Sequence, residues 1–150
     1  MRLARIVAGG FGCGAAPVAP GTAASAAAAL CGYALLLWPG YMLGLAALAA
    51  ILAGLWAIRV ARADGDPGWV VIDEVAGQWV TLLGLARPSL AGVLAGFVIF
   101  RLLDITKPGP VGWADRQPGA AGVMADDVVA GLISAAILWV ARSRWPALFG

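Results

Sequence analysis

The sequence predicts an all-α, polytopic membrane protein with about five membrane helices and a Gly/Pro-rich N-terminal loop. Apolar residues make up 62% of the 150 residues and charged residues only 12%, about half the share that is usual in soluble proteins. The mean hydropathy of +0.90 excludes an intrinsically disordered chain, which needs low hydrophobicity and high charge. No repeat or linker divides the chain, so residues 1–150 are expected to form a single membrane domain.

The N-terminal segment superficially resembles a signal peptide, because Arg2 and Arg5 precede apolar residues. Glycines and prolines from Gly9 to Pro20 interrupt any helix there, so we predict a retained loop. This loop delivers Thr22 and Ser25 to the start of a helix, where backbone N–H groups and hydroxyls favour a bound phosphate. A capped helix that simply follows a breaker loop would have the same pattern.

Five apolar stretches are candidates for membrane helices. The hydrocarbon core of a bilayer is about 30 Å thick and requires about 20 apolar residues in a helix. The stretches are bounded by Pro, Gly or charged residues and comprise Thr22–Trp38, Tyr41–Ala61, Trp69–Leu85, Ser89–Lys107 and Val123–Ala141. The first two contain no acid, whereas each of the other three carries acidic residues.

The basic residues predict the orientation of these segments. With the N-terminus in the cytoplasm and the C-terminus outside, seven basic residues lie inside (Arg2, Arg5, Arg59, Arg62, Arg101, Lys107, Arg116) and three outside (Arg87, Arg142, Arg144). This bias agrees with the positive-inside rule. All eight acids then lie on the inner side as well: Asp64, Asp66, Asp73, Glu74, Asp104, Asp115, Asp126 and Asp127. Such complete segregation predicts a functional site at the cytoplasmic interface.

Two pairs of adjacent acids are the candidate metal ligands. Asp73 and Glu74 are four and five residues into the third segment, about 6 to 7 Å along a helix, where ionised carboxylates are costly and repel one another unless a cation offsets them. Asp126 and Asp127 open the fifth segment in the same way. Oxygen ligands of this kind suit Mg²⁺. For the second pair, stabilisation by the helix macrodipole at an N-terminus is the structural alternative.

A row of three charged residues ends the fourth segment. Arg101, Asp104 and Lys107 are spaced by three and share one helical face. The functional interpretation is phosphate capture by Arg101 and Lys107, with Asp104 as a metal ligand or base. The alternative is an internal ladder of ion pairs with a snorkelling lysine. The remaining acids, Asp64, Asp66 and Asp115, are predicted to lie in solvated turns and loops.

The composition also excludes several chemistries. The chain has no histidine, so a His nucleophile, a His base or a His-ligated metal is excluded, and any catalysis depends on carboxylates. The net charge of +2 is too small for a nucleic-acid-binding protein, which needs clustered basic residues. The expected partners are therefore a membrane and a membrane-borne substrate.

Four stretches together resemble the phosphatidylglycerophosphatase A family of bacterial membrane phosphatases. They are GFGCGAAPVAPGTAAS, VVIDEVAGQW, FVIFRLLDITKPGPVGWADR and GVMADDVVAG, and the resemblance runs from Gly10 to Gly131. It departs from the family pattern at Ala24, where the usual motif has glycine, and this leaves less room for backbone contact with phosphate.

The resemblance implies removal of the terminal phosphate of phosphatidylglycerophosphate to give phosphatidylglycerol, with Mg²⁺, at the cytoplasmic face of the bacterial inner membrane. It assigns the catalytic acids to Asp73, Glu74, Asp104, Asp126 and Asp127, and the metal to Asp73, Glu74, Asp126 and Asp127. The phosphate-binding groups are then Thr22, Ser25, Arg101 and Lys107.

Two other classes of membrane protein are alternatives to this one. A CDP-alcohol phosphotransferase acts on lipid headgroups with Mg²⁺, but its D-G-x2-A-R-x8-G-x3-D-x3-D signature is absent from the chain. A small cation channel or transporter subunit would carry acids along its whole pathway, whereas the predicted outer half has none.

Overall fold

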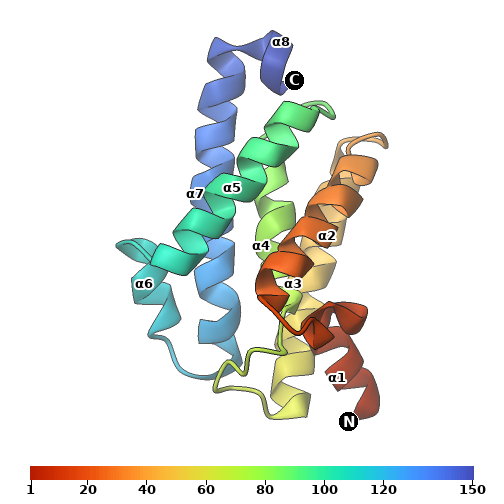
Figure 1. Cartoon of the computed structure of the whole chain (residues 1–150), viewed down its shortest axis with the longest axis vertical. Coiled ribbons are helices and arrows are strands. Elements are labelled where there is room, and N and C mark those ends of the chain that lie inside the picture. Colours follow the sequence, from red (N-terminus) through yellow and green to blue (C-terminus); the bar gives the residue numbers. More distant parts are fainter.

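The computed structural model describes all 150 residues and contains helices and no strands, as predicted (Figure 1). The elements in order are α1 (Arg2–Ala8), the 3₁₀ helix η1 (Gly10–Ala15), α2 (Pro20–Leu35), α3 (Tyr41–Ala61), α4 (Ile72–Leu82), α5 (Leu90–Thr106), α6 (Pro110–Asp115), α7 (Gly119–Arg144) and α8 (Pro146–Phe149).

Helix α4 is the centre of the bundle. It contacts α2, α3, α5 and α7, and eight of its 11 residues are buried. Figure 1 shows α4 between α7 on one side and α2 and α3 on the other, with α5 crossing in front of it. Most side chains on α4 therefore face another helix.

Two helices are long and apolar enough to cross a membrane: α3 with 21 residues and α7 with 26. The other predicted spans form shorter helices, with 16 residues in α2, 17 in α5 and 11 in α4. At 1.5 Å per residue α4 is about 16 Å long, roughly half the thickness of a bilayer core. The all-helical class is confirmed, and five complete spans stay a prediction.

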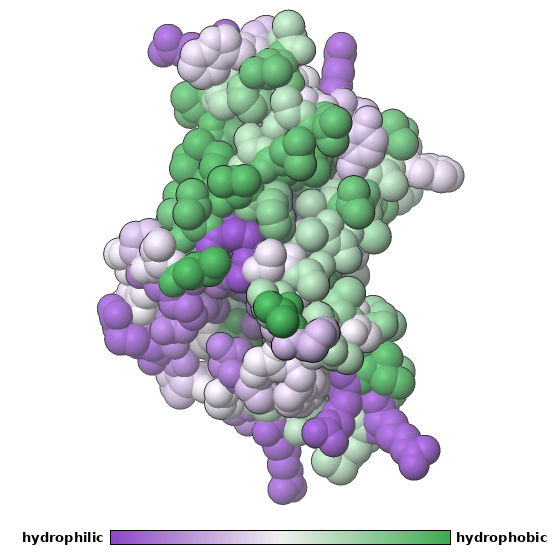
Figure 2. All heavy atoms as spheres, in the orientation of Figure 1, coloured by the Kyte–Doolittle hydropathy of each residue, from purple (hydrophilic) through white to green (hydrophobic).

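Large apolar side chains cover much of the surface. Leu90, Leu94, Val98 and Leu102 form an exposed row at intervals of four residues on α5, and α3 exposes Leu45, Leu48 and Leu52. Figure 2 shows apolar residues over the upper half of this face, whereas hydrophilic residues gather over the lower part. An apolar surface of this extent is typical of a protein that contacts lipid.

Local sequence signals set several helix ends. Pro20 is the first residue of α2, a position that proline favours because its missing N–H would have no partner there. Ser89 caps α5 by accepting a hydrogen bond from the Gly92 backbone N–H at 3.1 Å. At the other end of α5, Lys107 adopts a left-handed conformation with φ of 46°, and Pro108 prevents the helix from continuing.

The prediction that the N-terminal segment forms a Gly/Pro-rich loop was wrong in part. Arg2–Ala8 form α1, and Gly10–Ala15 form η1, so irregular backbone is confined to short stretches between these helices and α2. Tertiary contacts explain the added order: the Val71 N–H donates to the Ala8 carbonyl at 2.9 Å, and the Arg5 guanidinium lies 5.3 Å from the centre of the Trp69 ring. The N-terminus thus packs against the segment that leads into α4.

Two predicted boundaries near the acids also differ from the structure. Helix α4 begins at Ile72 rather than Trp69, so Asp73 and Glu74 lie in its first turn rather than 6 to 7 Å along it. Helix α7 begins at Gly119, so Asp126 and Asp127 are its eighth and ninth residues. Because these two acids lie two turns inside the helix, the macrodipole at an N-terminus does not explain them.

Candidate active site

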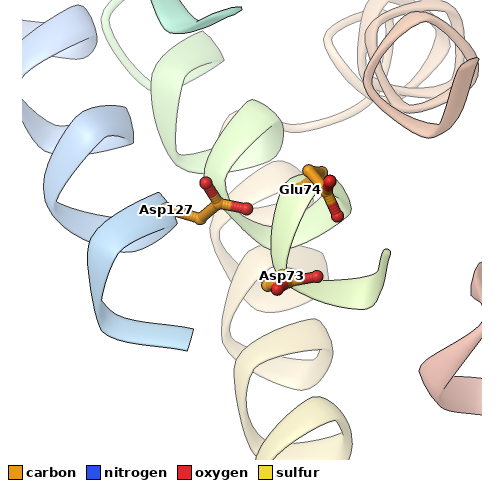
Figure 3. A group of neighbouring side chains, drawn as sticks. All are labelled: Asp73, Glu74 and Asp127. Atoms are coloured by element: carbon orange, nitrogen blue, oxygen red, sulfur yellow. The ribbon is translucent and has the colours of Figure 1, made fainter. Parts of the chain in front are cut away.

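The acids of α4, α5 and α7 form two overlapping groups. Carboxylate oxygens of Asp73, Glu74 and Asp127 lie within 4.8 Å of one another, and so do those of Asp104, Asp126 and Asp127. In Figure 3 the Asp127 side chain reaches from α7 toward α4, which carries Asp73 and Glu74. Asp127 belongs to both groups and links them into one cluster. The structure therefore brings together all five acids that were predicted to be catalytic.

Close contact between α4 and α7 produces this arrangement. A Cβ atom on Gly77 would lie 2.6 Å from the Asp127 carbonyl oxygen, and one on Gly131 would lie 2.5 Å from the Gly77 carbonyl oxygen. Only hydrogen fits at such distances, so the two glycines allow the helix backbones to touch. Each glycine follows a site acid by one turn, Gly77 after Asp73 and Gly131 after Asp127. The glycine contact thus sets the separation of these carboxylates.

The cluster is buried and incompletely paired. Asp73 and Asp126 are each 5% exposed and Asp127 is 3% exposed. Four of its buried carboxylate oxygens have no hydrogen-bond donor: Oδ1 of Asp73, Oε2 of Glu74, Oδ1 of Asp126 and Oδ1 of Asp127. Unpaired buried carboxylates repel one another and lose their hydration, which a cation would offset. These oxygen donors fit Mg²⁺, which prefers hard oxygen ligands.

Basic residues border the cluster on one side. Arg101 pairs with Asp104 on α5, and Lys107 pairs with Asp115 of α6 and with Asp126, the latter at 2.6 Å. Of the predicted row of ion pairs, only Arg101–Asp104 is present, because Lys107 pairs with acids of α6 and α7 instead of with Asp104. These two ion pairs hold its ammonium group against α6 and α7. Lys107 is a cation at neutral pH.

The start of α2 approaches the cluster from another side. A Cβ atom on Gly21 would collide with the Glu74 carboxylate and would lie 3.5 Å from Nη1 of Arg101. Thr22 is half-buried in the first turn of α2, next to this contact. Ser25 is fully buried, and its hydroxyl donates to the Gly21 carbonyl at 2.8 Å. The residues predicted to bind phosphate thus lie on α2 and at the end of α5, and both helices contact the carboxylate cluster.

Three residues near the site were not predicted to belong to it. Asp115 pairs with Lys107, and Asp66 is close enough to Lys107 and Asp104 for their charges to affect its pKa. Gln78 is fully buried on α4, with both amide atoms unpaired. A signal for Gln78 was present, because a polar side chain within an apolar stretch four residues after an acid lies on nearly the same helical face.

The fold and site define a helical protein with two helices of membrane length and a cluster of buried carboxylates bordered by two cations. The model of the phosphatidylglycerophosphatase A family matches residues 6–142. The chain belongs to this family, and it is a phosphatase.

Curated relatives match over most of the chain. Phosphatidylglycerophosphatase A of Escherichia coli (strain K12) is 41% identical over 145 residues, which cover 94% of this chain and 84% of the relative. A putative phosphatidylinositol-3-phosphatase of Bacteroides thetaiotaomicron is 38% identical and covers 89% of both chains. Phosphatidylglycerophosphatase A of Haemophilus influenzae is 33% identical, covering 89% of this chain and 85% of the relative. No solved structure matches the chain.

Proposed function

We propose that this protein hydrolyses the terminal phosphate of phosphatidylglycerophosphate, giving phosphatidylglycerol, and that the reaction depends on Mg²⁺. The observation that carries the proposal is the cluster of five acids around Asp127, with four buried carboxylate oxygens that lack a donor. The Escherichia coli and Haemophilus influenzae relatives, both named phosphatidylglycerophosphatase A, support the lipid substrate. Family membership favours neither the CDP-alcohol phosphotransferase nor the cation channel.

The proposed roles follow the chemistry of each side chain. Asp73, Glu74, Asp126 and Asp127 would hold Mg²⁺, with Asp104 as a further ligand or a base. A bound Mg²⁺ would neutralise charge on the phosphate and activate water.

Arg101 and Lys107 are proposed to bind the anionic oxygens of the substrate, assisted by Thr22 and Ser25 at the start of α2. Arg101 can grip two oxygens with its planar guanidinium, whereas Lys107 acts as a point charge. Asp104, Asp115 and Asp126 pair with these cations. The ion pairs hold both basic groups beside the carboxylates.

The proposed location is the bacterial inner membrane, with several membrane segments and the active site facing the cytoplasm. Three observations support this placement: two helices of membrane length, exposed apolar rows on α3 and α5, and the basic bias of the segment ends. In Figure 1 the α8 end of the molecule lies far from α1 and from the start of α4. A reporter fused after Gly150 tests the orientation, since an extracytoplasmic C-terminus is expected and a cytoplasmic one would overturn it.

The substrate can be tested with purified protein in detergent micelles containing Mg²⁺. Phosphate release is measured from phosphatidylglycerophosphate and, because of the Bacteroides thetaiotaomicron relative, from phosphatidylinositol 3-phosphate. We expect a higher kcat/KM for phosphatidylglycerophosphate. Preference for the inositol lipid, or no release from either, would refute the proposal.

A further inference from the structure

The amide of Gln78 is a buried polar group that nothing in the protein satisfies. Gln78 is 0% exposed, and neither its Nε2 nor its Oε1 has a hydrogen-bond partner. An unsatisfied buried amide costs about 1 to 3 kcal/mol in proteins. The other fully buried polar side chains of the bundle, Ser25, Thr81 and Ser134, each donate to a backbone carbonyl of their own helix. Gln78 is the exception among them.

Neighbouring contacts define where Gln78 points. On α4, Gly77 faces Phe100 of α5 and the Asp127 backbone, whereas the indole of Trp79 donates to the Ala28 carbonyl of α2 at 2.9 Å. Gln78 lies between these two residues on the helix, 100° from each, and so points between α5 and α2.

Gln78 also lies beside the candidate active site. It follows Glu74 by four residues, so it shares nearly the same face and lies about 6 Å further along the helix axis. Arg101, whose Nη1 approaches Gly21 next to Glu74, has a buried Nε without an acceptor. The unpaired polar atoms of Gln78 on α4 and Arg101 on α5 therefore extend the polar site from the carboxylates toward the interior of the bundle.

The chemistry of the amide selects its partner. Gln78 offers one free donor group and one free acceptor, whereas the oxygens of a phosphodiester only accept. A hydroxyl both donates and accepts, so it satisfies both atoms of the amide. In phosphatidylglycerophosphate the glycerol between the two phosphate groups carries one free hydroxyl, adjacent to the carbon that bears the reacting phosphate.

We propose that Gln78 is a specificity-determining residue that binds the free glycerol hydroxyl of the lipid headgroup while the terminal phosphate occupies the carboxylate and basic cluster. The inference rests on the function proposed above. It explains why a neutral amide is kept unpaired in the apolar centre of the bundle. A site built to bind a hydroxyl rejects an analogue that lacks it, because its own polar groups are then left unpaired.

The test compares two substrates on three forms of the protein in detergent at saturating Mg²⁺. The substrates are phosphatidylglycerophosphate and the analogue in which 1,3-propanediol replaces glycerol, so that only the central hydroxyl is missing. The proteins are the wild type, Gln78→Met, which has similar volume and no amide, and Thr81→Val. The last is the matched control, since it removes a buried polar group one turn further along α4 whose hydrogen bond to Gly77 is internal to the helix.

We expect the wild type to prefer the glycerol substrate by at least about tenfold in kcat/KM. For Gln78→Met, the kcat/KM values for the two substrates should differ by no more than about twofold. Thr81→Val should keep the wild-type preference. Thermal unfolding of Gln78→Met should occur at or above the wild-type temperature, because the substitution removes an unsatisfied amide.

Two results would overturn the inference and leave the proposed function intact: a wild type that hydrolyses both substrates equally well, or a Gln78→Met variant that keeps the wild-type preference. Either one would mean that Gln78 does not bind the glycerol hydroxyl. The wild-type comparison needs no variant, so the inference is testable even if Gln78→Met does not fold. If the wild type releases no phosphate from phosphatidylglycerophosphate, the proposed function fails and the inference fails with it.

Discussion

Gly131 of α7 lies directly against Gly77 of α4, so that a Cβ atom on Gly131 would be only 2.5 Å from the Gly77 carbonyl oxygen. One turn before each of these glycines are the acids Asp127 and Asp73, which belong to one carboxylate group. Because the two helix backbones touch at these glycines, the two buried carboxylates one turn earlier also lie close together.

Replacement of Gly131 by alanine should damage both stability and activity. The new methyl group meets backbone rather than a flexible side chain, so the helices must separate, at a cost of about 1 to 3 kcal/mol. Thermal unfolding and phosphate release measure the two effects. Gly44→Ala is the matched control: Gly44 lies within α3 with open space around its Cβ position, and the substitution should stabilise the helix by up to about 1 kcal/mol. A Gly131→Ala variant with wild-type stability and turnover would contradict this account of the helix contact.

Asp127→Asn should reduce phosphate release by at least about a hundredfold, because this residue is the one member shared by both carboxylate groups. The metal-free protein should remain folded, with an unfolding temperature equal to or above that of the wild type, since the substitution relieves repulsion among buried carboxylates. Asp64→Asn, at an exposed acid of the loop before α4, is the control and should retain activity. Near-normal turnover of Asp127→Asn at low Mg²⁺ would remove Asp127 from the proposed ligands.

Arg101→Lys should lower kcat/KM by at least about tenfold, equivalent to about 1.4 kcal/mol, because lysine keeps the charge but loses the planar group that grips two phosphate oxygens. The Mg²⁺ concentration for half-maximal activity should stay unchanged, in contrast to Asp127→Asn, which should raise it. A silent Arg101→Lys together with an unfolded Arg101→Ala would identify Arg101 as only the structural partner of Asp104.

We expect Asp66 to make the free energy of unfolding depend on pH. Although Asp66 is an exposed residue, partial loss of hydration raises the pKa of its carboxyl, Lys107 opposes this, and Asp115 and Asp104 raise the pKa further. The folded protein therefore binds this proton more tightly than the unfolded chain does. Above the pKa of Asp66 in the folded protein, the charged carboxylate lowers the free energy of unfolding. Below the pKa in the unfolded chain, about 3.9, both states are protonated and the effect vanishes.

Asp66→Asn should accordingly raise the unfolding temperature slightly at pH 7 and leave it unchanged near pH 3.5. Asparagine tolerates the left-handed backbone of this position, where φ is 49°, so the substitution isolates the charge. An equal shift at both pH values would show that the charge of Asp66 is not the cause.

The sequence predicted the helical class and the acids that cluster in the structure, because both follow from local patterns. Apolar runs bounded by Pro, Gly and charge identified the ranges of α2, α3, α5 and α7 to within a few residues, and acids in such runs are costly enough to indicate a function. Helix α1 was missed because its order comes from contacts with Trp69 and Val71, which are distant in sequence. The partners of Lys107 were missed for the same reason: Asp115 and Asp126 approach it only through the packing of α6 and α7.

The dependence of phosphate release on metal tests the central claim most directly. Purified wild-type protein is freed of divalent ions with a chelator and offered phosphatidylglycerophosphate while Mg²⁺ is added back in steps. We predict no release without metal, recovery on addition of Mg²⁺, and a higher Mg²⁺ requirement for any residual activity of Asp127→Asn. Full turnover in the presence of the chelator would contradict the assignment of the buried carboxylates as metal ligands.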